Sequence, residues 1–99
     1  KMEFERIIQN CELHVLDPAL AIEIKEILKE MYMDLKTKEK VEEMNSKKLL
    51  YALKQYSIAN TKTVIQKPKE YFKKCILSAI GQTELSTQYD AYTIEMGAV

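Results

Sequence analysis

The chain has 99 residues, the length of one domain with one compact core. Hydrophobic residues make up 46% of it and charged residues 30%, which is typical of a soluble globular protein. Two glycines and two prolines are too few for the tight turns of a sandwich or a barrel, so we expect long helices. The net charge is zero, but residues 1–45 hold 7 Lys and Arg against 11 Asp and Glu, whereas residues 46–99 hold 8 against 4.

Nothing in the sequence predicts export or a membrane. No apolar run approaches the roughly 18 residues of a membrane span, and the N-terminus lacks the apolar segment of a signal peptide. Cys11 and Cys75 belong to no set with metal-ligand spacing, so we expect buried free thiols in a reducing compartment. These features predict a cytoplasmic protein.

A first, short amphipathic helix is predicted in the first dozen residues. Its apolar residues recur at intervals of three and four, the spacing of one helical face. They are Phe4, Ile7, Ile8 and Cys11. His14 follows and is the only histidine. Because a structural metal site takes about four ligands, we interpret His14 as a turn residue and expect no metal.

A second helix is predicted from Asp17-Pro18 to about Leu35. Asp is a favoured N-cap, and Pro is well tolerated at the first helical position. The apolar stripe of this helix consists of Leu20, Ile24, Ile27, Leu28, Met31 and Leu35. Ile22 and Met33 lie nearly opposite the stripe. They indicate either a central helix buried on two faces or a surface for self-association or a partner.

The segment from Thr37 to Glu43 is mostly charged. Its only apolar anchors are Val41 and the following Met44, so we expect a connector or one further helical turn. Asn45 or Ser46 is then the predicted cap of the next helix.

The helix that follows is expected to bury one stripe and to point its lysines outward. The stripe consists of Leu49, Leu50, Leu53 and Tyr56. Residues 60–63 are turn-like in composition, so we expect the helix to end before them. Val64 and Ile65 are predicted to fill the core before the chain turns back.

The strongest helix signals lie between Pro68 and Gly81. Pro68 suits the first helical position, and Gly81 is expected to close the helix in a left-handed conformation. The buried stripe is predicted to be Tyr71, Phe72, Cys75, Ile76, Ala79 and Ile80. Leu77 falls on the other side among charged residues, a position that the core does not explain. We therefore predict a partner-binding face made of Glu70, Lys73, Lys74 and Leu77.

The regular pattern fades after Gly81. Residues 84–99 contain Tyr89, Tyr92, Ile94 and Met96. They are compatible with a last docking helix, which would cover the face around Leu77, or with a flexible tail.

Eight lysines lie between Ser46 and Cys75, against Glu70 alone. Such a basic field can attract nucleic acid, although a charged run on a helix is also typical of a solvated surface. The lysines with the best placement for DNA are Lys62, Lys67, Lys69 and Lys74. Because this region has no arginine for reading bases, any DNA binding is expected to be weak and independent of sequence.

No catalytic constellation can be assembled from these residues. The sequence has no phosphate-binding glycine loop and no nucleophile paired with a histidine. Glu42 and Glu43 are adjacent, but their charged surroundings keep them hydrated, and general acid–base catalysis needs desolvation. We predict a protein that is not an enzyme and needs no cofactor.

Residues 44–53, 60–72 and 76–80 carry a resemblance to a known family. The order of Asn45-Ser46, the leucine helix, Asn60-Thr61, the basic turn and Tyr71-Phe72 resembles the C-terminal domain of RepA-type plasmid replication initiators, the RepA_N family. That domain is similar to the C-terminal domain of the DnaD primosome proteins. The resemblance covers roughly 40 residues. It departs at the exit of the last helix, where Ala79-Ile80-Gly81 replaces the family's Asn-Ala-Pro.

The prediction is thus a compact all-α bundle of four to five helices, DnaD-like, in one domain over residues 1–99. The resemblance implies the C-terminal domain of a longer initiator that docks host replication proteins, primase or helicase-loading machinery, at the plasmid origin. One alternative is a weak DNA-binding domain that acts through its lysines. Another is a helical adaptor or oligomerisation module, and the oligomeric state stays open.

Overall fold

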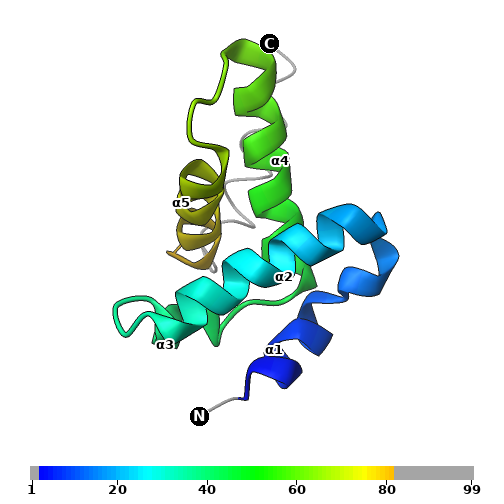
Figure 1. The fold of residues 1–99 in the computed structure, drawn as a ribbon, viewed down its shortest axis with the longest axis vertical. Helices are drawn as coiled ribbons and strands as arrows, with labels where there is room; N and C mark the ends of the chain where they lie inside the picture. Colours follow the sequence, from blue (N-terminus) through cyan, green and yellow to red (C-terminus); the bar gives the residue numbers. More distant parts are fainter. Residues whose placement is uncertain (1–2, 82–99) are drawn as a thin grey trace, which may run out of the picture.

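The computed structural model describes residues 3–81, and this part of the chain is helical throughout, without a β-strand (Figure 1). The predicted all-α bundle is confirmed. The expectations for residues 84–99 lie outside the described residues. The elements are α1 (Phe4–Cys11), the 3-10 turn η1 (Leu13–Val15), α2 (Pro18–Met33), α3 (Lys38–Val41), α4 (Ser46–Lys62) and α5 (Pro68–Gly81).

Local side-chain chemistry sets where α2 and α4 begin. Asp17 Oδ2 accepts hydrogen bonds from the backbone N–H groups of Ala19 (3.2 Å) and Leu20 (3.3 Å), ahead of Pro18. Asn45 Oδ1 accepts from the N–H of Lys48 at 2.9 Å. Each cap satisfies backbone donors that have no partner inside the helix. Both predicted caps are confirmed, with Asn45 rather than Ser46 in the second.

A left-handed residue ends α1. Glu12 has φ 53° and ψ 48°, and its N–H donates to the carbonyl of Gln9 at 3.1 Å. It is the only residue other than glycine with positive φ in residues 3–81. The reversal leads into η1, which contains His14, so the predicted turn position of this exposed histidine is confirmed.

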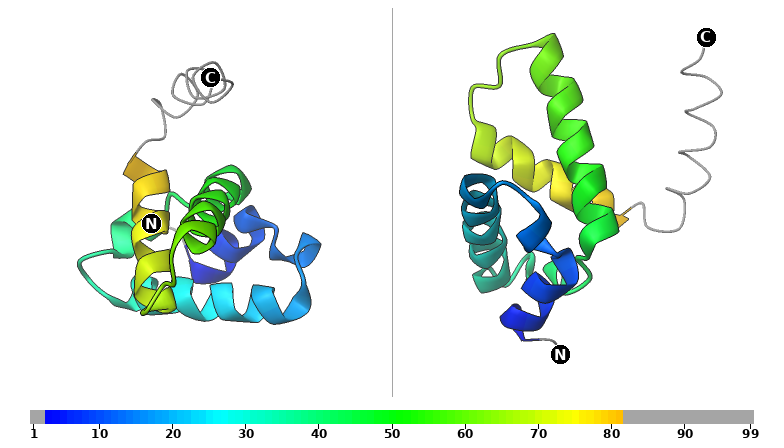
Figure 2. Two further views of the ribbon diagram at one scale, coloured as in Figure 1. Left: turned by 90° about the horizontal axis from the view of Figure 1, so that it is seen from above. Right: turned by 90° about the vertical axis from the view of Figure 1, so that its right-hand side faces the viewer.

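Helices α4 and α5 form a hairpin that the other helices cover from one side. Residues 63–67 connect the pair, which packs more extensively than any other two elements. Helix α2 runs across the lower part of the pair in Figure 1, and Figure 2 shows the same arrangement from two further directions. Helix α1 contacts both α2 and α4, while α3 contacts α2 and α5. All five helices therefore meet around one core.

The core is a single cluster to which every helix contributes. Its fully buried side chains include Ile7, Ile24, Leu28, Val41, Met44, Leu49 and Ile76. The ring of Phe72 is also buried and meets Tyr56 edge to face, with 5.8 Å between ring centroids. This geometry is a favourable one for aromatic pairs. Val41 and Met44 anchor the charged connector, as predicted.

The predicted helix ends were less accurate than the starts. Helix α2 ends at Met33, before the 88% exposed Leu35, because Asp34 Oδ1 accepts from the N–H of Lys36 at 2.9 Å and turns the chain. Helix α4 runs through residues 60–62, where a turn was predicted. Its backbone ladder continues there, with the N–H of Thr63 donating to the carbonyl of Ala59. Gly81 is the last helical residue and has no positive φ.

Several apolar side chains point elsewhere than predicted. Leu50 is 60% exposed and Val64 is 83% exposed, so neither fills the core. Tyr71 is at the surface, although it was predicted to lie on the buried stripe. Ile22 and Met33 are both exposed, which excludes the interpretation of α2 as a helix buried on two faces. For Leu50 and Tyr71 the cause is that periodicity identifies a stripe but not how much of it the neighbouring helices cover.

Candidate docking surface

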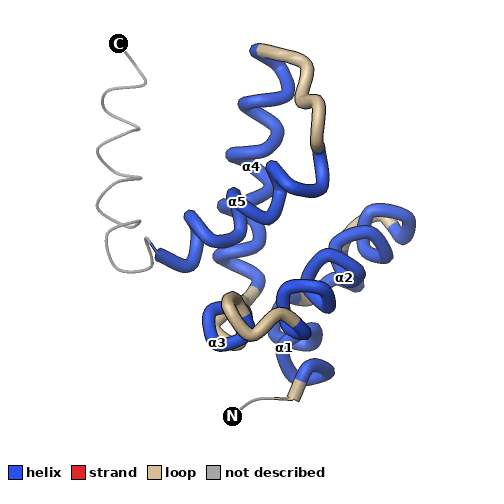
Figure 3. Tube along the Cα trace, turned by 60° about the vertical axis from the view of Figure 1, so that its left-hand side comes forward, coloured by secondary structure: helices blue, strands red, loops and turns tan. Residues whose placement is uncertain are grey.

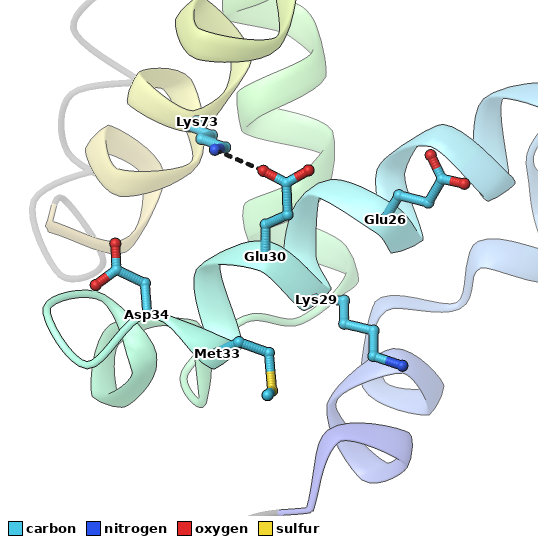
Figure 4. A pocket seen from close by; sticks show the side chains of 6 residues that line it. All are labelled: Glu26, Lys29, Glu30, Met33, Asp34 and Lys73. Carbon is cyan, nitrogen blue, oxygen red and sulfur yellow. Dashed lines mark hydrogen bonds and ion pairs between the residues drawn. The ribbon is translucent and has the colours of Figure 1, made fainter.

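Two of the predicted site lysines, Lys69 and Lys73, are engaged within the fold. Lys69 Nζ lies 2.7 Å from Glu30 Oε2, and Lys73 Nζ lies 2.9 Å from Glu30 Oε1. Glu30 comes from α2 and both lysines come from α5. Figure 4 shows the Glu30 carboxylate directed at Lys73 across the space between the two helices. Lys73 Nζ is also 3.6 Å from Glu70 Oε2.

The pair of ammonium groups changes the acidity of Glu30. Hydrogen bonds from Lys69 and then Lys73 lower the pKa of the Glu30 carboxyl to about 2. The hydrogen bond to Glu30 in turn raises the pKa of Lys73. Glu30 and Lys73 therefore both stay charged near neutral pH. Since a phosphate would have to displace Glu30 from these lysines, Lys69 and Lys73 are poorly placed to bind DNA.

A shallow hollow of about 620 Å³ lies beside this ion cluster. Its lining residues are Glu26, Lys29, Glu30, Met33, Asp34 and Lys73. Figure 4 shows Glu26, Lys29 and Asp34 pointing in different directions rather than towards one point. General acid–base chemistry requires such groups within hydrogen-bond reach of one reacting atom. The hollow therefore provides no catalytic arrangement.

A second hollow, of about 320 Å³, lies where α4 turns into α5. It is lined by Ala59, Thr63, Val64, Ile65, Gln66, Lys67, Glu70, Tyr71 and Lys74. We use the name turn surface for five of its exposed residues, Val64, Lys67, Glu70, Tyr71 and Lys74. Lys67, Glu70, Tyr71 and Lys74 recur on one side of α5 because residues three, four and seven apart share a helix face.

The turn surface combines apolar and charged groups. Val64 and Tyr71 are its apolar residues. The Tyr71 ring contacts the ring of Tyr56, with 6.1 Å between the two ring centroids. Lys67 and Lys74 flank them without an ion-pair partner among residues 3–81. An exposed apolar centre with a charged rim is the usual anatomy of a small protein interface.

The structure divides the predicted partner-binding face. Glu70 and Lys74 belong to the turn surface, whereas Lys73 belongs to the ion cluster with Glu30. Leu77 is partly buried and packs against the core, so the expectation that the core has no use for it is wrong.

The predicted DNA-binding lysines are divided in the same way. Lys67 and Lys74 lie together on the turn surface, and Lys62 is exposed at the end of α4 nearby in sequence. Lys69 is held by Glu30. The sequence reasoning also missed two members of the surface, Val64 and Tyr71, which it assigned to the core. Val64 carried one usable signal, since the polar Thr63 and Gln66 flank the Val64-Ile65 pair in a segment without helical periodicity.

Two further features of the described residues bear on function. Residues 3–81 contain no cluster of three or more histidine, cysteine or carboxylate side chains that could hold a metal ion. None of the helices in this range is long and apolar enough to cross a membrane. Comparison with known proteins adds no relative, because no family model, curated protein or solved structure matches the chain.

Proposed function

We propose that this chain is a protein-interaction domain of a plasmid replication initiator, which docks host primase or helicase-loading proteins through the turn surface. The replication context is supported by the resemblance of residues 44–80 to RepA-type initiators. The docking role is supported by one structural observation above others. Val64 and Tyr71 are both exposed on the lining of one hollow, together with Lys67 and Lys74, which have no ion-pair partner in residues 3–81.

The energetics favour this surface over the rest of the α5 face. Binding energy in protein interfaces concentrates in a few central side chains, and tyrosine is among the most frequent of them. Tyr71 already forms a tilted ring pair with Tyr56, so less side-chain freedom is lost when a partner covers it. Lys67 and Lys74 favour a partner with an acidic surface. Charge complementarity of this kind raises the association rate and the selectivity for the partner more than it raises the affinity.

The test is direct binding to purified primase and to purified helicase-loading protein from a Gram-positive host, measured by calorimetry. Val64→Glu should weaken binding at least tenfold, since it places a charge in the apolar centre. Leu35→Glu is the matched control, because Leu35 is equally exposed but lies between α2 and α3. Equal losses in the two variants, or no binding of either host protein to the unmodified chain, would contradict the proposal.

Weak binding of single-stranded DNA is a second candidate function, favoured by the exposure of Tyr71 between Lys67 and Lys74. Lysines neutralise phosphates and exposed aromatic rings stack on unpaired bases. Titration of a labelled oligonucleotide at several salt concentrations separates this role from protein docking. If DNA is the ligand, Lys67→Ala with Lys74→Ala should abolish binding, whereas Lys69→Ala should change it little because Glu30 already holds Lys69.

A further inference from the structure

A groove with an apolar lining lies between α2, α4 and α5, the three helices labelled at the centre and right of Figure 3. Its volume is about 420 Å³. Ile24, Ile27 and Phe72 are buried in its floor, while Leu20, Leu53 and Tyr56 are only partly covered. The remaining lining residues are Glu23, Glu26, Pro68 and Lys69.

The rim of this groove is acidic. Glu23 and Glu26 stand on the α2 wall, both exposed, and neither has an ion-pair partner among residues 3–81. Figure 4 shows the carboxylate of Glu26 directed away from Lys73. Residues three apart on a helix are neighbours, with about 5–6 Å between their Cβ atoms. Lys69, on the opposite wall, is paired with Glu30, a carboxylate that it shares with Lys73, so the two free glutamates outweigh it on the rim.

The groove shares no lining residue with the turn surface, although Tyr56 of the groove contacts Tyr71 of the turn surface. It uses Pro68, Lys69 and Phe72 of α5, whereas the turn surface uses Lys67, Glu70, Tyr71 and Lys74. At about 100° per residue these two sets lie on nearly opposite sides of the helix. The two surfaces also differ in charge, because one is rimmed by free carboxylates and the other by free lysines. A partner that suits one of them is therefore unsuited to the other.

We propose that this groove binds a short amphipathic peptide helix whose apolar side chains enter between Leu20, Leu53 and Tyr56 and whose arginine or lysine side chains meet Glu23 and Glu26. Charge complementarity identifies the occupant. An acidic peptide or a nucleic acid would bring negative charge onto two adjacent free carboxylates, whereas basic side chains are attracted to them.

The groove geometry favours a helix as the form of that peptide. The walls are themselves helices, and laying an apolar helix face into an apolar groove is a recurring mode of peptide recognition. The apolar contacts would supply most of the affinity, and the two carboxylates would supply orientation and selectivity against acidic sequences. This inference does not depend on the proposed function of the turn surface.

The experiment is a selection from random 16-residue peptides displayed on phage, carried out on the full chain. Selected peptides should combine apolar positions three and four apart with flanking arginine or lysine. Synthetic copies should shift the amide resonances of Leu20, Leu53 and Tyr56 in a nitrogen-15 correlation spectrum. Glu23→Lys with Glu26→Lys should weaken their binding at least tenfold in fluorescence anisotropy, because two attractions become repulsions.

The control variant is Glu5→Lys with Glu39→Lys, which makes the same change in net charge on the exposed faces of α1 and α3. It should bind the peptides as the unmodified chain does. The proposal is overturned if the selected peptides are acidic, if both double variants lose binding equally, or if the shifts map to Lys67 and Lys74. It is also overturned if no peptide is enriched, or if only small apolar molecules occupy the groove.

Discussion

The side chain of Leu77 packs against the core although it lies about 160° around α5 from the centre of the main apolar stripe. Helix α5 has neighbours on more than one side, since α4, α2 and α3 all contact it. A residue opposite the main stripe can therefore still lose water on folding. The exposed apolar residues of this region are instead Val64 and Tyr71, where the chain leaves α4 and enters α5.

A single substitution tests this placement of Leu77. Leu77→Glu should lower the free energy of unfolding by about 1–3 kcal/mol, because a charge would replace an apolar contact with the core. Leu50→Glu is the control, since Leu50 is 60% exposed on α4, and its effect should stay within about 0.5 kcal/mol. Urea unfolding followed by circular dichroism measures both. If the two variants prove equally stable, Leu77 belongs to the surface.

At the scale of helices, starts were predictable from the sequence and ends were not. Asp17 and Asn45 cap α2 and α4 through bonds to residues two or three positions away, so the signal is local. The end of α2 depends on Asp34 folding back on the backbone of Lys36, an interaction that competes with helix continuation. Residues 60–62 are turn-like in composition, but their backbone continues the hydrogen-bond ladder of α4, so the extra turn was missed.

The candidate site was predictable only in part for a related reason. Glu70 and Lys74 were predicted as part of the partner-binding face, and Lys67 and Lys74 as part of the basic field for DNA. The loss of Lys69 and Lys73 from that site was not predictable, because both bind Glu30, which is 39 and 43 residues away in sequence. Pattern reasoning within one helix cannot detect an ion pair that forms only after two helices pack.

The contact of Glu30 with Lys69 and Lys73 makes the attachment of α2 to α5 sensitive to pH. The pKa of Glu30 is about 2 in the folded chain, below its usual 4.5, so the unfolded chain takes up the proton first as pH falls. The resulting stabilisation is fully present above about pH 4.5 and is lost as pH falls towards 2. Glu30→Gln should therefore be less stable than the unmodified chain at pH 7, and the difference should shrink between pH 4.5 and 2.

Urea unfolding at a series of pH values checks this expectation. The effect should be modest and should weaken with added salt, because all three groups are solvent-accessible. Glu43→Gln is a suitable control, since Glu43 Oε1 lies 3.9 Å from Lys48 Nζ in a looser and more local contact. A stability difference for Glu30→Gln that persists unchanged at pH 2 would show that the ion cluster is not its source.

Across the whole molecule, the charge asymmetry of the sequence becomes a difference between surfaces. The acidic first half supplies Glu23 and Glu26 to the groove, and the basic second half supplies Lys67 and Lys74 to the turn surface. Glu30 is the place where the two halves neutralise each other. The zero net charge therefore conceals two surfaces of opposite sign, each suited to a partner that the other would repel.

The two cysteines test whether the described helices unfold as one unit. Cys11 in α1 and Cys75 in α5 are free and buried in the same core cluster, and burial raises the pKa of both thiols, that of Cys11 to about 11. Few thiolates are therefore present near neutral pH, and reagents reach the sulfur atoms only when the core opens.

We expect iodoacetamide to label Cys11 and Cys75 at similar rates, and both rates should rise together across the urea transition. Mass spectrometry can measure the two rates separately. A chelator should change neither rate, and folding should need no oxidant. Much faster labelling of Cys75 than of Cys11 would mean that α5 opens while α1 stays packed, and loss of helical signal on chelation would show that the chain needs a metal to fold.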